Sequence, residues 1–324
     1  MTVFIRVLTG TLVLFMVGCA SAPPWPETAG GGASQPPIQL DVPFFPQERY
    51  QCGPAALASM LASQAVSVTP DELVPQVYLP EREGSLKVEL VAAARQYGLL
   101  VYPLESDLAD ILTEIDAGHP VLVMQNLGFD WFPQWHFAVV IGYDPVAEDL
   151  ILHTDTRRAN RQPVSVFYRT WHRAGQWAAV ILPPGDFPAT VQPLPYLEAA
   201  QDLEVTGQRA AALASYQAAA ERWPDQPAAR LGMGNIAFAQ QEWVQAVRYY
   251  AATVENFPGL APGWNNLAHA LARAGCAPQS VDSLACANQL GPKSYPSDLP
   301  IFEKSSEPPS TGFACPVIQC PVAD

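Results

Sequence analysis

The stretch QERYQCGPAAL, residues 47–57, places a cysteine directly before a segment typical of a helix start. Pro54 fits the first helical turn, where backbone amides have no intrahelical acceptor. A thiol at a helix N-terminus faces the positive end of the helix dipole, which is expected to lower its pKa and favour the nucleophilic thiolate. If the intervening loop folds Gln47 beside the thiol, its side-chain amide and the backbone amide of Cys52 would both donate to a developing oxyanion. The stretch therefore predicts nucleophilic attack on a carbonyl by Cys52.

A thiol nucleophile needs a base, and His136 is the first choice among the five histidines. It opens the apolar run HFAVVIGYD, residues 136–144, directly after the aromatic segment FDWFPQW. A strand would hold its backbone in a fixed position, as a general base requires. The runner-up is His153, at the end of the next apolar run. The remaining histidines lie in a turn, a surface segment and a helical segment: His119, His172 and His269.

Of the six cysteines, Cys19 is expected to carry a lipid and four others to form disulfides, which leaves Cys52 as a free thiol. Two disulfides are expected among the four cysteines of the last helical segment and the tail, and three pairings are possible. We favour bridges from the tail to the last helical unit, since a solenoid end needs a cap. A zinc site is the competing interpretation, but no CxxC pair is present, so we expect neither metal nor cofactor. These four cysteines are Cys276, Cys286, Cys315 and Cys320.

The segment that carries the candidate site, residues 38–185, reads as an α+β domain. Helices come first in the chain and strand-like runs follow, separated by turn residues. The expected helices are 52–64, 85–98 and 107–118, and the expected strands are 99–104, 120–127, 136–144, 148–154 and 177–184.

VPFFPQERYQCGPAALASML (42–61), followed by WHFAVVIGYD (135–144), resembles the bacteriocin-processing, double-glycine branch of the papain-like cysteine peptidases. The resemblance implies a peptide or protein substrate. It also implies that Gln47 serves the oxyanion hole, Cys52 is the nucleophile, His136 the base and Asp155 the orienting residue. One departure is Thr156, where the family usually has a proline after the acidic residue.

In this family the orienting residue, an Asp or Asn, usually lies at the end of the strand that follows the histidine strand, so the resemblance implies Asp155, after the run LILHT. Asp144 is the alternative, but it lies eight residues along the strand that begins at His136. At about 3.3 Å per residue, that distance is too long for contact with the ring.

From about residue 196 the chain becomes alanine-rich and repeats every 34 residues. Pro224, Pro258 and Pro292 mark the period. Residues 196–292 resemble three tetratricopeptide repeats, which implies an all-α solenoid that recruits a protein partner. An unrelated helical bundle is the alternative. Residues 293–324 form a Pro- and Ser-rich tail.

The N-terminal residues predict that the protein is located outside the cytoplasm. Residues 1–18 read as a signal peptide with an apolar run from Val7 to Val17. Gly18-Cys19 resembles a bacterial lipobox, which implies a lipid on Cys19 and, with Ser21, sorting to the periplasmic face of the outer membrane; ordinary secretion is the alternative. Residues 19–37 read as a flexible tether. A net charge of −14 disfavours a nucleic-acid partner.

The sequence thus predicts an α+β papain-like cysteine peptidase domain followed by a tetratricopeptide-repeat solenoid, anchored outside the cytoplasm. A non-catalytic peptide-binding scaffold is the main alternative, and acyl transfer or amide hydrolysis on a non-protein substrate is a third possibility. The segment FDWFPQW is either an aromatic lip over the substrate or a packed loop.

Overall fold

A computed structural model describes residues 25–26, 36–47, 51–82, 84–291, 295 and 313–321. The expected signal peptide 1–18, the lipidation site Cys19, most of the tether and much of the tail lie outside these residues.

A layer of helices covers one face of the sheet. It comprises α2 (Cys52–Ser63), α3 (Pro70–Val77), the short 3₁₀ helix η2 (Pro80–Arg82) and α4 (Lys87–Gln96). Helix α2 is rich in alanine and is buried along most of its length, because small side chains let it lie close to the strands. Helix α3 begins at Thr69, whose backbone and hydroxyl both bind the Glu72 carboxylate in a capping box.

The sheet is antiparallel throughout, and its order is β2-β7-β3-β4-β5-β6, with β1 also paired to β4. Gly142 permits this last pairing, because a Cβ atom there would lie 2.1 Å from the Ile38 carbonyl oxygen. The strands are β1 (Ile38–Gln39), β2 (Leu100–Pro103), β3 (Val121–Asn126), β4 (Trp135–Asp144), β5 (Asp149–Thr154), β6 (Arg157–Pro163) and β7 (Ala178–Leu182).

Side chains of alternate residues in the central strand β4 pack on opposite faces of the sheet. Phe137, Val139 and Ile141 pack with the core under α2 and α4. Ala138 and Val140 pack with the core under α5 (Leu108–Asp116) and α6 (Val164–His172). This arrangement confirms the α+β domain with an antiparallel sheet.

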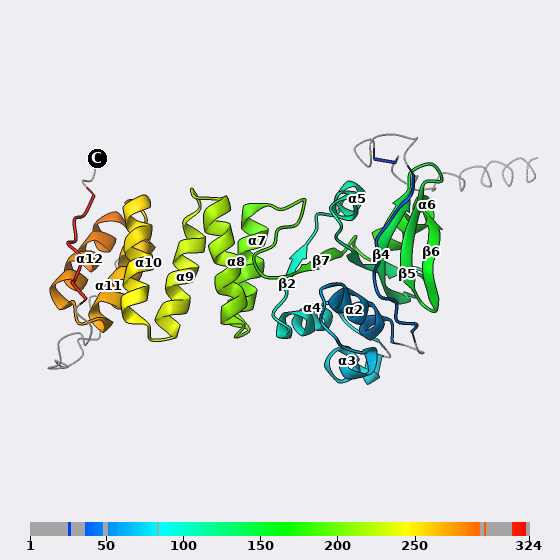
Figure 1. The fold of residues 1–324 in the computed structure, drawn as a ribbon, viewed down its shortest axis with the longest axis horizontal. Coiled ribbons are helices and arrows are strands. Elements are labelled where there is room, and N and C mark those ends of the chain that lie inside the picture. Colours follow the sequence, from blue (N-terminus) through cyan, green and yellow to red (C-terminus); the bar gives the residue numbers. More distant parts are fainter. Residues whose placement is uncertain are drawn as a thin grey trace, which may run out of the picture.

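The C-terminal region is helical, as the sequence predicts. Between residues 193 and 290 each helix packs on the next in chain order (Figure 1). Glycines on α9 make close contact possible: a Cβ at Gly234 would lie 2.3 Å from the ring of Tyr250, and one at Gly232 would lie 2.4 Å from Tyr216. Assignment to tetratricopeptide repeats stays a prediction. These helices are α7 (Pro193–Val205), α8 (Arg209–Arg222), α9 (Pro227–Ala239), α10 (Trp243–Asn256), α11 (Ala261–Arg273) and α12 (Ala277–Leu290).

The sheet domain and the first helices share one hydrophobic core. It runs from Leu100 and Tyr102 on β2 to the fully buried Tyr196 of α7 and on to Tyr216 of α8. Polar contacts reinforce the junction: the Tyr102 hydroxyl accepts the Gln192 N–H at 2.9 Å. The ion pair between Arg95 on α4 and Asp202 on α7 also crosses it. The two parts are therefore packed together rather than joined by a free linker.

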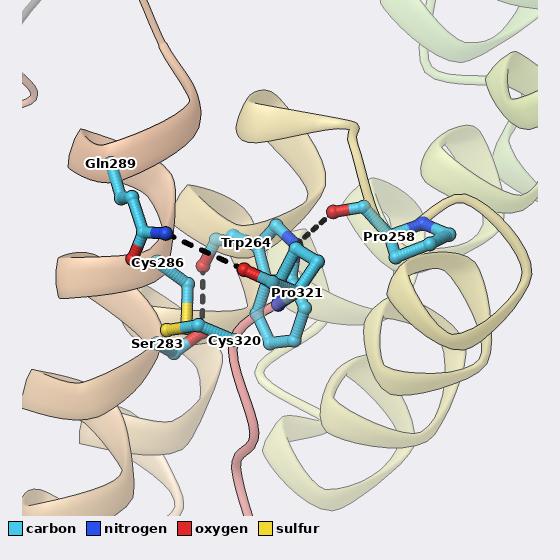
Figure 2. Close-up of a disulfide and its surroundings, with 7 residues drawn as sticks. All are labelled: Pro258, Trp264, Ser283, Cys286, Gln289, Cys320 and Pro321. Carbon is cyan, nitrogen blue, oxygen red and sulfur yellow. Dashed lines mark hydrogen bonds between the residues drawn. A yellow bond between two sulfur atoms is a disulfide. The ribbon is translucent and has the colours of Figure 1, made fainter. Parts of the chain in front are cut away.

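Two disulfides hold the tail segment 313–321 against the last helices. They join Cys276 to Cys315 and Cys286 to Cys320, which is the kind of pairing that the sequence favours. Figure 2 shows Cys320 bonded to α12 beside Trp264. Nearby, Gln289 donates to the Pro321 carbonyl at 3.4 Å. Across the parts of the chain that the structure describes, no helix has the length and apolar character needed to cross a membrane.

Candidate active site

Cys52 is the first residue of α2, and it is the free cysteine among those that the structure describes. Its sulfur lies within hydrogen-bonding reach of the backbone N–H of Phe137, which belongs to the peptide unit joining His136 to Phe137. The N-terminus of α2 therefore meets the first residues of β4. This contact brings the thiol to the backbone of the residue that follows His136, the histidine that the sequence nominates as the base.

The expectation of a lowered pKa at Cys52 is wrong. Burial raises the pKa of the thiol above its usual value, and the backbone N–H groups of Phe137, Gly53 and Cys52 offset only part of this effect. The free energy lost when the thiolate is removed from water is larger here than the stabilisation that the N–H groups at the helix N-terminus give it. Cys52 is therefore a neutral thiol at pH 7.

His136 is the second residue of β4, opposite Gln125 of β3. Its Nε2 atom lies 2.8 Å from the Thr154 hydroxyl at the end of β5, and Thr154 is only 7% exposed. Burial lowers the pKa of His136 to about 4, although the charge of Asp155 opposes this and that of Arg157 reinforces it. The imidazole is therefore neutral at physiological pH and can accept a proton.

Asp155 lies in the turn between β5 and β6 rather than in hydrogen-bonding contact with His136. Its backbone is left-handed, with φ 55°, and its side chain is exposed. Its carbonyl oxygen accepts the backbone N–H of Gln47 at 3.2 Å. Asp155 thus acts on His136 through its charge, and the direct partner of the ring is Thr154.

Strand alternation was the signal that could have identified Thr154. Leu150 and Leu152 of β5 belong to the same core as Ala138 and Val140 of β4, and Thr154 and His136 continue these two series. Adjacent strands place residues of the same face side by side. Asp155 is the more obvious candidate in the sequence, but it follows Thr154 and is therefore out of step with the residues of β5 that share the face of His136.

Gln47 lies at the same end of the sheet as His136. It is half-buried, and its backbone bond to Asp155 fixes the loop that precedes α2. Residues 48–50, between Gln47 and α2, lie outside the described part. The placement beside the β5–β6 turn keeps Gln47 a candidate oxyanion donor.

His153, the runner-up base, has a structural role. Its Nε2 atom lies 2.9 Å from the Val42 carbonyl, and its Nδ1 accepts the Ala159 N–H at 3.2 Å. Both ring nitrogens are occupied by backbone groups, so this histidine is a neutral tautomer with no free lone pair. His119 is likewise engaged, with Nδ1 2.7 Å from the buried Glu114 carboxylate.

The site holds a neutral thiol and a neutral imidazole. Within the described residues, the side-chain hydrogen bond of His136 goes to Thr154 and none joins it to Cys52. Such bonds are often long before substrate binds. No group of three or more His, Cys, Asp or Glu side chains in the described residues is arranged to hold a metal ion. The chemistry that this arrangement supports is proton transfer from thiol to imidazole during nucleophilic attack.

Residues 39–179 match the family described as Peptidase_C39 like family. Three solved structures are similar at low identity. The first is a C39-like peptidase from Bacillus anthracis, at 18% identity and TM-score 0.39, with 46% of this chain and 98% of that one covered.

The other two belong to transporter proteins. A double-glycine motif protease from an AMS/PCAT transporter, solved with its leader peptide, has 21% identity and TM-score 0.34, with coverage of 45% and 96%. The peptidase domain of Streptococcus ComA has 22% identity and TM-score 0.37, with coverage of 43% and 97%. No curated protein matches the chain. Residues 39–179 are thus similar to the peptidase C39-like family, and a helical region follows them.

Proposed function

We propose that the chain is a cysteine peptidase that hydrolyses peptide bonds with Cys52 as nucleophile and His136 as general base. The observation that carries the proposal is the contact between the Cys52 sulfur and the peptide unit that follows His136. It places the two groups at one end of the sheet, in a domain that matches a peptidase family. Thr154 is the positioning residue for the imidazole.

The reaction follows from the neutral state of the pair. As the Cys52 sulfur attacks the substrate carbonyl, its proton passes to His136 and a tetrahedral oxyanion forms. The backbone amide of Cys52 and the side chain of Gln47 are the proposed donors to that oxyanion. His136 returns the proton to the leaving amine as the C–N bond breaks. Water, deprotonated by His136, then cleaves the thioester and releases the thiol.

The test is labelling with an electrophilic peptidyl probe, for example a peptidyl acyloxymethyl ketone, and peptide cleavage followed by mass spectrometry. Cys52→Ala should abolish both, and His136→Gln should reduce both. Cys52 is half-buried, so Ser59→Ala at a buried position of the same helix serves as a control for packing. Equal labelling of the wild type and Cys52→Ala would refute the proposal.

A non-catalytic, peptide-binding role is the second candidate, and one observation favours it. Among the described residues, the imidazole is hydrogen-bonded to a neutral hydroxyl rather than to a carboxylate, and a hydroxyl stabilises an imidazolium less than a charged partner does. In that role, peptides would bind to the protein with Cys52 replaced by alanine as tightly as to the wild type, and no cleavage products would form.

We further propose that residues 196–292 are three tetratricopeptide repeats that recruit a protein partner, and that lipid on Cys19 anchors the chain to a periplasmic membrane face. The 34-residue spacing of Pro224, Pro258 and Pro292 supports the repeats. The apolar run before Gly18-Cys19 supports the anchor. Cys19→Ser should release the protein from the membrane fraction; unchanged fractionation would contradict the anchor.

A further inference from the structure

A cavity of about 420 Å³ lies between α10, α11 and the tail segment, and we call it the cap cavity. On the helix side Val254, Trp264 and Leu267 line it, and on the tail side Val317 and Ile318 do so. Cavities of this size hold a drug-sized molecule or a few residues of a peptide. The two disulfides hold the tail against the helices, so the cap cavity is a built part of the fold.

One of these disulfides lies beside the cap cavity. Figure 2 shows three lining residues, Pro258, Trp264 and Pro321, next to the bond between Cys286 and Cys320. The indole N–H of Trp264 donates to the Pro258 carbonyl at 2.7 Å, so the polar edge of the ring is already engaged. The rest of the ring can pack against the carbon atoms of a ligand or attract a cation through its π-system.

Among the described residues that line the cap cavity, Glu255 alone is charged. It lies in the last turn of α10 and is exposed, and within the described part of the chain it forms no ion pair. Arg248 lies seven residues earlier on α10, roughly 10 Å along the helix axis, and does not line the cavity. A ligand in the cap cavity therefore meets a single carboxylate that no described cation neutralises.

The preceding helix pair shows how the same framework holds a cation. The bounds of α8 and α9 recur in α10 and α11 after 34 residues, so Arg230 stands at the position that Trp264 takes in the next pair. Arg230 donates to the Pro224 carbonyl at 2.9 Å, and Trp264 bonds the equivalent carbonyl. The guanidinium of Arg230 lies 5.9 Å from the centroid of the Phe257 ring. Because α11 replaces this arginine with an indole, a ligand of the cap cavity can supply the cation.

The tail also offers backbone groups to a ligand. Within the residues that the structure describes, no backbone–backbone hydrogen bond involves residues 316–319, which belong to no helix or strand. An extended peptide can pair with such backbone groups, as it does at an exposed strand edge. A peptide therefore fits this wall better than a small free cation does.

We propose that the cap cavity binds a lysine or arginine side chain of a partner peptide, with its aliphatic stem against Trp264 and Val317 and its charged end at Glu255. Long cationic side chains bury an apolar stem while the charged end stays near water, which suits an apolar cavity with one exposed carboxylate. The inference rests on the proposed recruitment of a protein partner, because it names the place and the chemistry of that contact. It does not depend on Cys52.

The test is affinity selection from a random decapeptide library by the full chain with Cys52→Ala, so that peptides are not cut, read by mass spectrometry. Peptides that contain lysine or arginine should be enriched. Glu255→Arg and Val317→Lys introduce a like charge from two walls, and each should reduce this enrichment about tenfold. The matched controls, which should leave it unchanged, are Glu221→Arg, 34 residues earlier on α8, and Val205→Lys at an exposed position of α7.

The controls are needed because a chain of net charge −14 attracts basic peptides in general. The inference is overturned if basic peptides are not enriched, if Glu255→Arg leaves their enrichment unchanged, or if Glu221→Arg reduces it equally. If other peptides are still enriched in that case, recruitment of a partner stands and only the cap cavity is excluded as its site.

A second variant tests the tail wall. Replacing Cys315 and Cys320 with serine should remove the enrichment of basic peptides while the helix signal in circular dichroism is kept, because the tail no longer closes the cavity. Full enrichment without the disulfides would contradict the inference. Peptide cleavage by the wild type is measured separately, and its absence would refute the peptidase proposal without affecting the cap cavity.

Discussion

Burial keeps the candidate base neutral, and replacing the Thr154 hydroxyl with a carboxylate tests whether a charged partner can offset that burial. In Thr154→Asp a carboxylate takes the place of the group that now lies 2.8 Å from His136 Nε2. The negative charge should stabilise the imidazolium and raise the pKa of His136 from its present value of about 4. It should also lower the free energy of the Cys52 thiolate and His136 imidazolium pair relative to the neutral thiol and imidazole.

Coulomb's law gives the scale of the effect. Two unit charges about 4 Å apart at an effective dielectric constant of about 20 attract by roughly 4 kcal/mol. At about 1.4 kcal/mol per pKa unit this is an upper bound of roughly three units. Position 154 is 7% exposed, so the new carboxylate loses hydration and its own pKa rises. We therefore expect the pKa of His136 to rise by about one to two units.

The assay is an NMR titration of the His136 ring, with His136→Gln to assign the signal. Alkylation of the Cys52 peptide by iodoacetamide, followed by mass spectrometry, gives the second readout. In the wild type the alkylation rate should rise about tenfold per pH unit from pH 6 to 8, as for an ordinary protonated thiol. In Thr154→Asp the rate at pH 5 should rise about tenfold or more and depend less on pH.

Two further variants separate Thr154 from its neighbour. Thr154→Val removes the hydroxyl at nearly constant volume, and Asp155→Asn removes the nearby charge. If Asp155→Asn shifts the titration of His136 further than Thr154→Asp does, Asp155 is the orienting residue after all. A midpoint that stays near 4 in Thr154→Asp would refute the electrostatic reasoning.

Three other perturbations follow from the structure. Because burial lowers the pKa of His136 from its usual value to about 4, the unfolded chain binds the extra proton between about pH 6.5 and 4. Stability should therefore fall by up to roughly 3 kcal/mol as the pH drops through this window, and urea unfolding of His136→Gln should lose that part of the dependence. Gly53→Ala should displace the start of α2, because its Cβ would lie 2.3 Å from the Ser85 oxygen; slower alkylation of the nucleophile with little loss of helix signal would show this. The disulfides of Cys315 and Cys320 close loops of 39 and 34 residues, each expected to contribute roughly 4 kcal/mol alone. Replacing both cysteines with serine should speed hydrogen exchange in α11 and α12 but not in the sheet; equal acceleration everywhere would contradict a local cap.

The order of helices and strands was predictable because the apolar runs are long and turn residues separate them. Several elements of the sheet domain were not, and β6 and α6 show why. Strand β6 has the sequence RRANRQP, which contains hardly any apolar residue, and it exists because it pairs with β5. Helix α6 contains β-branched and aromatic residues, yet its buried Phe167 and Trp171 hold it against the sheet. In both cases tertiary contacts outweigh local propensity.

The candidate site also has features that the local sequence predicts and features that depend on tertiary contacts. Cys52 and His136 were found from residue type and spacing, and the structure places them at one end of the sheet. Their protonation states could not be read from the sequence, because burial depends on the whole fold and outweighs the helix terminus. Thr154 was missed because a hydroxyl partner has no sequence signature beyond strand alternation.

The shared core between the sheet and helices α7 and α8 limits how this chain can be divided. Strand β2 lies beside α7 (Figure 1), and its Leu100 and Tyr102 belong to the core that the sheet shares with the helices. A cut near residue 185, where the sheet domain ends in sequence, would therefore open this core. The same cut would leave the Arg95 guanidinium without its carboxylate partner. The core continues to Met233 and Ile236 of α9, so a unit that keeps it intact extends through α9. Any exchange of the helical region for another module, in the laboratory or in evolution, must carry α7, α8 and α9 along with the sheet domain.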